Sequence, residues 1–220
     1  MKLVLASGSQ RRRELLTMCG YDYEIIVSNA DETIDENDPE SFVRALSFRK
    51  AKDVFDRLFA AGRRDFAVIG SDTVVAFQKE GETKPVIIGK PKDAKDAVRI
   101  LSMLSGKTHR VFTGVSVIAD IPDENAAAQC SIREKAEIQT ECSITEVTFE
   151  TLSPDEIADY VNSGDPLDKA GSYGIQGPFG MFVREIRGNY FTVIGMPIPV
   201  LYKMLKKIGI LPHGFYERIE

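Results

Sequence analysis

The stretch FAVIGSDTVVAF at residues 66–77 decides the fold. Its first part, FAVIG, is a short apolar run followed by polar residues, which is typical of a buried strand. Ser71, Asp72 and Thr73 come next, before the alternating VVAF. Because ligands of α/β proteins bind beside the carboxyl ends of strands, Asp72 is a candidate for holding Mg²⁺ or activating water. The alternative is an aspartate that only forms a turn.

The segments on either side predict an α/β protein with one mixed sheet, folded as a single domain in two lobes around a cleft. Helical and strand patterns alternate in the first half of the chain, and long alternating strands dominate the second half. We expect further strands at 2–6, 21–27, 85–89, 109–119, 137–150, 181–187 and 190–195. We expect helices at 9–18, 39–60, 93–104 and 153–164, and one after Pro197. The domain is expected to span 1–210, with the polar stretch 121–136 as an insertion and 211–220 as a C-terminal tail.

Composition excludes several classes of protein. The 220 residues are 43% hydrophobic and 28% charged, which is close to the globular average and excludes a disordered chain. The net charge of −5 disfavours a nucleic-acid coat, and no apolar run reaches the roughly 18 residues of a membrane span. The N-terminus lacks the pattern of a signal peptide, so we expect a cytoplasmic protein. Cys19, Cys130 and Cys142 lack the spacing of a zinc site and are expected to be reduced thiols.

The segment between the first predicted strand and helix is rich in phosphate-binding groups. It has the sequence SGSQRRR over residues 7–13. A helix N-terminus offers free backbone N–H groups, to which Ser7 and Ser9 add hydroxyl donors. Arg11 and Arg12 would hold phosphate oxygens through bidentate hydrogen bonds. The alternative is an ordinary helix capped by Ser9 with a solvated basic face; the P-loop pattern is absent.

Four more places in the sequence carry candidate functional groups. Asp31 and Glu32 lie in an acidic segment that is either a solvated loop or, if it faces Asp72, part of a metal site. Lys90 precedes a proline that orients its turn, and the amide of Gln176 in a glycine-rich stretch would suit a base edge. His109 is either a general base or a packing residue.

Seven motifs together resemble the Maf family of nucleoside triphosphate pyrophosphatases, which are related in fold to inosine triphosphatases. They occur in the family's order from residue 3 to about 205: LASGSQRR, the DE pair, GSDTVV, GKP, LSGKTHRVFTG, GDPLDKAGSYGIQG and VIGMP. Each motif alone is weak, whereas seven in order are specific. One departure is Gln10, which stands where the family usually has proline; losing a proline at the first helical position restores an N–H, so phosphate binding is expected to survive.

The resemblance implies an enzyme that hydrolyses a nucleoside triphosphate to the monophosphate and pyrophosphate with Mg²⁺ or Mn²⁺. The family's proton acceptor falls on Asp72, and its phosphate-binding loop falls on Ser7, Ser9, Arg11 and Arg12. The other catalytic positions of the family fall on Glu32, Lys50 and Lys90, with Glu32 and Asp72 as the expected metal ligands. The resemblance further implies a homodimer with a nucleotide as substrate. From the charge and hydropathy given above, we expect neither a membrane nor a stable nucleic-acid partner.

Three positions bear on the substrate. Family members that act on dTTP and UTP resemble this chain at Arg11, Thr73 and Gln176, whereas those that act on 7-methyl-GTP have an aromatic residue in place of the first loop arginine. The resemblance therefore implies the dTTP/UTP type. Two alternatives stay open: a pyrophosphatase for modified purine nucleotides, and a regulator of cell division that binds nucleotides or nucleic acid without turnover.

Overall fold

The strand predicted at 66–70 is longer in the computed structural model, which describes residues 1–121 and 136–214. Strand β3 runs unbroken from Phe66 to Phe77, so Asp72 lies in its middle and the prediction that it follows a strand end is wrong. The strand continues because β5 (Thr108–Asp120) pairs with it antiparallel from Phe66 to Ala76. This pairing provides the polar triplet with a neighbouring strand for its backbone hydrogen bonds.

The opposite edge of β3 explains why Asp72 is still open to a ligand. Strand β1 (Lys2–Leu5) pairs in parallel with this edge only as far as Ile69. Strand β4 (Val86–Ile88) pairs antiparallel with it from Val75 onward. Among the described strands, none covers the edge between these two partners. The gap begins where a parallel strand ends, which is where α/β proteins place ligands.

The complete sheet is mixed, with its strands in the order β2-β1-β3-β5-β6-β7 and β4 beside β3. The long strands predicted in the second half are confirmed as β5 and β6 (Ala136–Phe149), and β7 (Val183–Arg187) follows beside β6. The strand predicted at 21–27 is only β2 (Glu24–Ile25). The expected fold class, a single mixed-sheet α/β domain, is confirmed.

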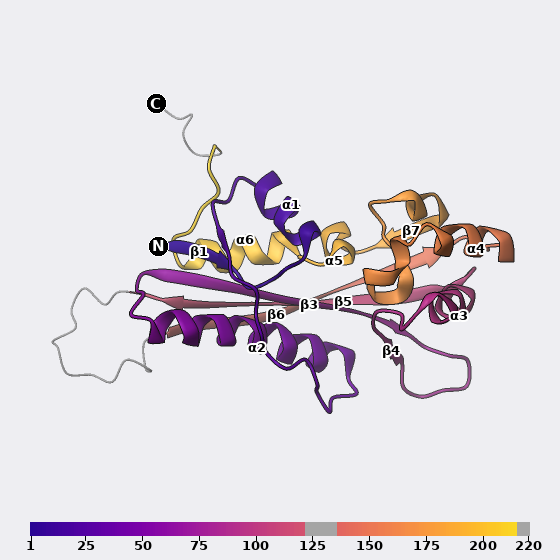
Figure 1. Ribbon diagram of the computed structural model, residues 1–220, viewed down its shortest axis with the longest axis horizontal. Helices are drawn as coiled ribbons and strands as arrows, with labels where there is room; N and C mark the ends of the chain where they lie inside the picture. Colours follow the sequence, from indigo (N-terminus) through magenta and orange to yellow (C-terminus); the bar gives the residue numbers. More distant parts are fainter. Residues whose placement is uncertain (122–135, 215–220) are drawn as a thin grey trace.

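Helices cover both faces of the sheet and form two lobes along it (Figure 1). Helix α2 (Pro39–Ala60) lies along one face, and α1 (Gln10–Met18), α5 (Tyr190–Ile194) and α6 (Ile198–Lys207) lie on the other. Helices α3 (Ala94–Leu104) and α4 (Pro154–Asn162) lie at the far end of the long strands, with 3₁₀ turns at Asp165–Asp168, Ala170–Ser172 and Pro178–Phe182. Separate apolar cores stabilise the two ends, one around Leu16 and Leu201 and the other around Leu101 and Phe149.

One predicted strand, at 190–195, is instead the short helix α5. The sequence YFTVI has strand-forming residues, but its flanks favour a helix. Asn189 accepts a hydrogen bond from the backbone N–H of Phe191 at 2.8 Å and caps the helix, and Gly195 ends it in a left-handed conformation. Capping therefore overrides the strand propensity.

Three expectations fall on residues outside the described ranges. They concern most of the insertion at 121–136, the thiol of Cys130 and the last six residues of the tail, 215–220. Within residues 1–121 and 136–214, no helix is long and apolar enough to cross a bilayer.

Candidate active site

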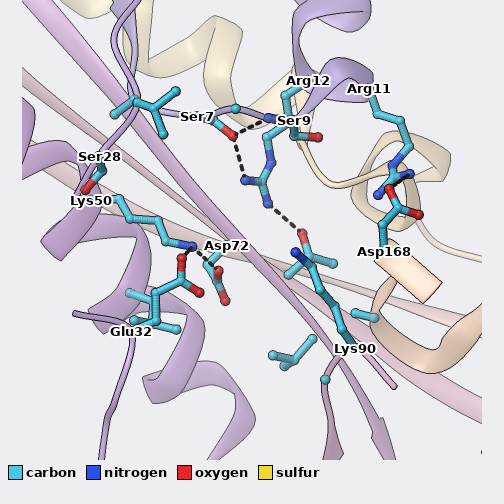
Figure 2. Close-up of a pocket in the computed structure, with 18 of the residues that line it drawn as sticks. Ser7, Ser9, Arg11, Arg12, Ser28, Glu32, Lys50, Asp72, Lys90 and Asp168 are labelled. Carbon is cyan, nitrogen blue, oxygen red and sulfur yellow. Dashed lines mark hydrogen bonds and ion pairs between the residues drawn. The ribbon is translucent and has the colours of Figure 1, made fainter. Parts of the chain in front are cut away.

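A cavity of about 750 Å³ opens over the uncovered edge of β3. Its walls come from the turn between β1 and α1, the acidic segment, α2, β3 and the turn after β4 (Figure 2). It brings together nine of the ten site residues predicted from the sequence: Ser7, Ser9, Arg11, Arg12, Glu32, Lys50, Asp72, Thr73 and Lys90. Segments that are far apart in the chain therefore meet at the point where β1 ends.

The turn from Ser7 to Arg12 is held by its own polar groups. Ser7 Oγ accepts hydrogen bonds from the backbone N–H of Ser9 at 3.2 Å and from Arg12 at 3.1 Å. With both lone pairs used, the Ser7 hydroxyl proton is available to donate to a ligand. The predicted side-chain cap by Ser9 is wrong, because Ser9 occupies the N-cap position without making that bond.

The guanidinium of Arg12 has three fixed acceptors. It donates to Gly195 O at 2.8 Å through Nε, to Ser7 Oγ, and to Thr73 Oγ1 at 3.3 Å. Desolvation lowers the pKa of Arg12 from its usual value, and the charge of Asp72 opposes this shift. Arg12 is thus a cation fixed in direction at the floor of the cavity, ready for an anion.

Lys50 lies between the two carboxylates of the cavity. Its Nζ is 2.7 Å from Oδ1 of Asp72 and 3.0 Å from Oε1 of Glu32 (Figure 2). The side chains of Lys50 and Asp72 are 12% and 11% exposed, whereas Glu32 is 65% exposed. One ammonium therefore compensates two carboxylates, one at the base of the cavity and one at its rim.

The position of Lys50 depends on how closely α2 approaches the sheet. A Cβ atom on Gly70 would lie 2.1 Å from Ser47 O, and one on Gly114 would lie 2.2 Å from Val43 O. Only glycine at these strand positions lets the helix backbone come so near. Both glycines fall within motifs quoted above, GSDTVV and LSGKTHRVFTG, but the sequence alone does not indicate that they let a helix pack closely.

The acidic segment is fixed over the cavity by Arg49. Its guanidinium donates to Asp31 O at 2.8 Å and to Thr33 O at 2.9 Å. Glu32 lies between these two carbonyls and its side chain reaches Lys50. The Asp31 side chain instead accepts a bond from the backbone N–H of Thr33. Of the predicted acidic pair, only Glu32 faces the cavity.

The carboxylates fit a divalent cation that is shared with a substrate. Mg²⁺ usually takes one or two protein carboxylates together with phosphate oxygens and water. Glu32 and Asp72 supply that number, and Lys50 contacts Oε1 of Glu32 and Oδ1 of Asp72. Residues 1–121 and 136–214 hold no cluster of three or more His, Cys, Asp or Glu side chains that would enclose a metal by themselves.

A second cavity of about 490 Å³ adjoins the first and contains Gln176, the tenth predicted residue. Arg11 and Thr73 line both cavities. Arg11 also pairs with Asp168 across 3.4 Å, and Asp168 lines both cavities as well. Asp168 was not predicted as a site residue, although it lies in the quoted motif GDPLDKAGSYGIQG. The three positions linked to substrate type therefore share one cavity.

Lys90 and His109 differ in their relation to the site. Lys90 lines the first cavity and forms no ion pair with another described residue. His109 is 2% exposed, and its Nε2 lies 3.0 Å from the hydroxyl of Tyr173. Burial lowers the pKa of His109 to about 3, so its ring is neutral near pH 7. Of the two interpretations of His109, the structure favours packing.

The fold and the cavities are those of an α/β protein whose candidate site has donors suited to a phosphorylated ligand and an adjoining space for a second group. More particularly, the chain belongs to the Maf family, since the profile of the Maf-like protein family matches residues 2–208. The resemblance found in the motifs is thereby confirmed.

The alignments with curated relatives cover almost the whole chain. A dTTP/UTP pyrophosphatase of Agathobacter rectalis is 40% identical over 217 residues, covering 95% of this chain and 98% of the relative. A dTTP/UTP pyrophosphatase of Bacillus thuringiensis subsp. konkukian is 42% identical over 210 residues, covering 95% and 96%. The solved structure of the Staphylococcus aureus Ham1 protein superposes with a TM-score of 0.50 at 14% identity, covering 94% of this chain and 99% of that one, which shows a shared fold.

Proposed function

We propose that this protein hydrolyses dTTP and UTP to the nucleoside monophosphate and pyrophosphate. Relatives that bear the name dTTP/UTP pyrophosphatase match nearly the full chain. The observation that carries the proposal is the arrangement of the first cavity, in which Asp72, Lys50 and Glu32 lie together with the serines and arginines of the β1–α1 turn. A phosphate chain and a group that activates water would meet there.

The substrate would lie across both cavities. Its phosphates would bind in the first cavity, where Ser7, Ser9, Arg11 and Arg12 offer hydroxyl and guanidinium donors. Its base would occupy the second cavity beside Gln176. Uracil and thymine share an N3–H donor and an O4 acceptor, which the amide of Gln176 complements with its oxygen and its NH₂ group.

The reaction would proceed by attack of water on the α-phosphorus. Asp72 would accept the proton from the water as the new P–O bond forms, and the bond from the α-phosphorus to the bridging oxygen would break to release pyrophosphate. Lys50 and Lys90 would offset the charge that grows on the leaving group. Glu32 and Asp72 would hold Mg²⁺ or Mn²⁺, which would neutralise charge on the phosphates.

Homodimer formation and a cytoplasmic location belong to the same proposal, and the dimer rests on the family resemblance. Light scattering on the purified protein, with and without UTP, measures the mass in solution directly. A mass of twice the 24.4 kDa of the chain supports the dimer. A mass equal to that of one chain under both conditions contradicts it.

The test of function is pyrophosphate release from a panel of nucleoside triphosphates in the presence of Mg²⁺. We expect release from dTTP and UTP, and we expect Asp72→Asn to lower kcat by about 10²–10⁴-fold while nucleotide binding persists. Asp159→Asn, on the exposed face of α4, is the matched control and should leave kcat unchanged.

Each other outcome would redirect the proposal. Release mainly from modified purine nucleotides would keep the hydrolase and overturn the roles of Arg11, Thr73 and Gln176. Binding without release from any nucleotide would favour the regulator. Unchanged turnover in Asp72→Asn would exclude Asp72 as the proton acceptor.

A further inference from the structure

A chain of hydroxyl groups crosses the sheet behind the phosphate-binding turn. Thr73 Oγ1 lies 3.0 Å from Thr113 Oγ1 on the neighbouring strand. Thr113 Oγ1 in turn lies 2.7 Å from the backbone oxygen of Thr192 in α5. Thr113 and Thr192 have no exposed surface, so water does not satisfy these groups.

The direction of these hydrogen bonds follows from counting protons. A threonine hydroxyl has one proton to donate, and a backbone oxygen can only accept. The proton of Thr113 therefore goes to Thr192 O, and Thr73 has to donate its own proton to Thr113. Thr73 Oγ1 is then left as an acceptor, and the group that donates to it is Arg12, at 3.3 Å.

We propose that Thr113 is a positioning residue that acts through Thr73 to orient the guanidinium of Arg12. The kinetic test of this inference rests on the function proposed above. The C-terminal end of α5 also holds Arg12 directly. Gly195 O, just after α5, accepts a hydrogen bond from Arg12 Nε at 2.8 Å. Two carbonyls of one short segment thus fix Arg12, one directly and one through two threonines.

The proposal also gives Thr73 a defined role. Its proton is used by Thr113, so Thr73 acts on the substrate by holding Arg12 rather than by donating to the base. Removal of the Thr113 hydroxyl leaves the Thr73 proton without its acceptor inside the protein. The Thr73 hydroxyl would then rotate toward another acceptor and turn its lone pairs away from Arg12.

The decisive variant is Thr113→Val, which keeps the branched shape and removes the hydroxyl. We expect kcat/KM for UTP to fall about ten- to hundredfold, chiefly through KM, because a desolvated donor of the binding site loses its fixed direction. Thr113→Ser retains the hydroxyl and should restore kcat/KM to within about threefold of the wild type.

The matched control is Thr148→Val. Thr148 is 7% exposed, and its hydroxyl pairs with Thr108 at 2.8 Å on strands β6 and β5. Neither residue lines the two cavities described above. This variant makes the same chemical change in a cross-strand threonine pair, at the buried member of the pair, and should leave kcat/KM unchanged.

A double-mutant cycle separates positioning from a general structural effect. If Thr113 acts through Arg12, Thr113→Val should have little further effect in an Arg12→Lys background, because the group that it orients is already gone. An equal loss in both backgrounds would overturn the proposal, and so would a Thr113→Val enzyme within twofold of the wild type. If Thr113→Val does not fold, Thr113→Ser against Thr113→Ala gives the same comparison of hydroxyl present and absent.

Binding of inorganic pyrophosphate, measured by calorimetry, tests the inference without turnover. We expect Thr113→Val to weaken this binding about tenfold or more, and Thr148→Val to leave it unchanged. A wild-type protein that binds pyrophosphate but releases none from any nucleotide would refute the proposed function alone. Equal pyrophosphate affinity in wild type and Thr113→Val would refute the role of Thr113 alone.

Discussion

The ammonium group of Lys50 lies 2.7 Å from the carboxylate of Asp72, and both side chains are almost wholly shielded from solvent. Charges so shielded are screened less by salt than a surface pair. Lys50 extends from α2 and Asp72 from β3, so that their charged groups meet in the cavity. Glu32, at the rim of the cavity, contacts the same ammonium group. The pair therefore links the helix to the sheet and sets the direction of the carboxylate assigned to proton transfer.

Replacing Lys50 by methionine tests this link. The change leaves Asp72 shielded and without its cation, so we expect the free energy of unfolding to fall by about 1–3 kcal/mol and pyrophosphate release to be largely lost. Urea unfolding and the release assay measure the two effects. Lys52→Met is the control, since its pair with Asp56 is exposed and should change stability by less than about 0.5 kcal/mol. Equal stability of the two variants would contradict the structural role of Lys50.

The close approach of α2 to the sheet predicts the effect of a single methyl group. In Gly114→Ala the new Cβ would lie 2.2 Å from Val43 O, which forces the helix outward. We expect a loss of about 1–3 kcal/mol in the free energy of unfolding and a fall in turnover as Lys50 shifts. Gly89→Ala is the control for stability, because its new methyl group would meet no described atom within 4 Å beyond its chain neighbours. If urea unfolding gave the same free energy for Gly114→Ala and Gly89→Ala, α2 would have to move away from the added methyl group at no cost.

Much of the fold follows from local patterns. The apolar and alternating runs predict the central strands β3, β5 and β6, and the helices predicted at 39–60 and 153–164 are confirmed as α2 and α4. The strand predicted at 190–195 is wrong, because the Asn189 cap decides against its strand-forming residues. The position of Asp72 within β3 also escapes prediction, since the length of that strand is set by its pairing with β5.

The candidate site likewise has one part that the sequence predicts and another that depends on the tertiary structure. The β1–α1 turn carries its chemistry in consecutive residues, so its phosphate-binding character is visible in the sequence. The contact of Lys50 with Asp72 depends on helix-to-sheet distance, and only the family resemblance pointed to Lys50. The hydroxyl chain through Thr113 depends on strand register, which aligns Thr73 with Thr113 and which no single segment encodes.

The exposed carboxylate of Glu32 offers a test of metal binding that spares the fold. Glu32→Gln removes one of the two charges expected to hold the cation, so the Mg²⁺ concentration for half-maximal pyrophosphate release should rise at least about tenfold. Thermal unfolding should hardly change, because the side chain is 65% exposed. Asp31→Asn, whose side chain faces its own turn, is the matched control. Identical Mg²⁺ dependence in Glu32→Gln and the wild type would remove Glu32 from the metal site.

The second cavity predicts where base selection arises. Gln176→Ala removes the amide expected to pair with N3–H and O4 of the base, so the ratio of kcat/KM for UTP to that for CTP should fall about 10–100-fold. The comparison requires both nucleotides under the same Mg²⁺ concentration. Gln78→Ala, at an exposed residue after β3, is the control and should keep the wild-type ratio. A uniform loss for both nucleotides would mean that Gln176 supports the cavity without selecting the base.

Buried His109 predicts how stability depends on pH. Burial lowers its pKa in the folded protein from 6.5 to about 3. Between these values the unfolded chain binds one proton more than the folded chain, so the free energy of unfolding falls as the pH decreases. From pH 6 to pH 5 this histidine should contribute a loss of about 1 kcal/mol. His109→Phe removes the titrating ring. Urea unfolding at the two pH values should therefore show a smaller pH dependence in His109→Phe than in the wild type. A wild-type slope in His109→Phe would show that His109 takes up its proton without unfolding.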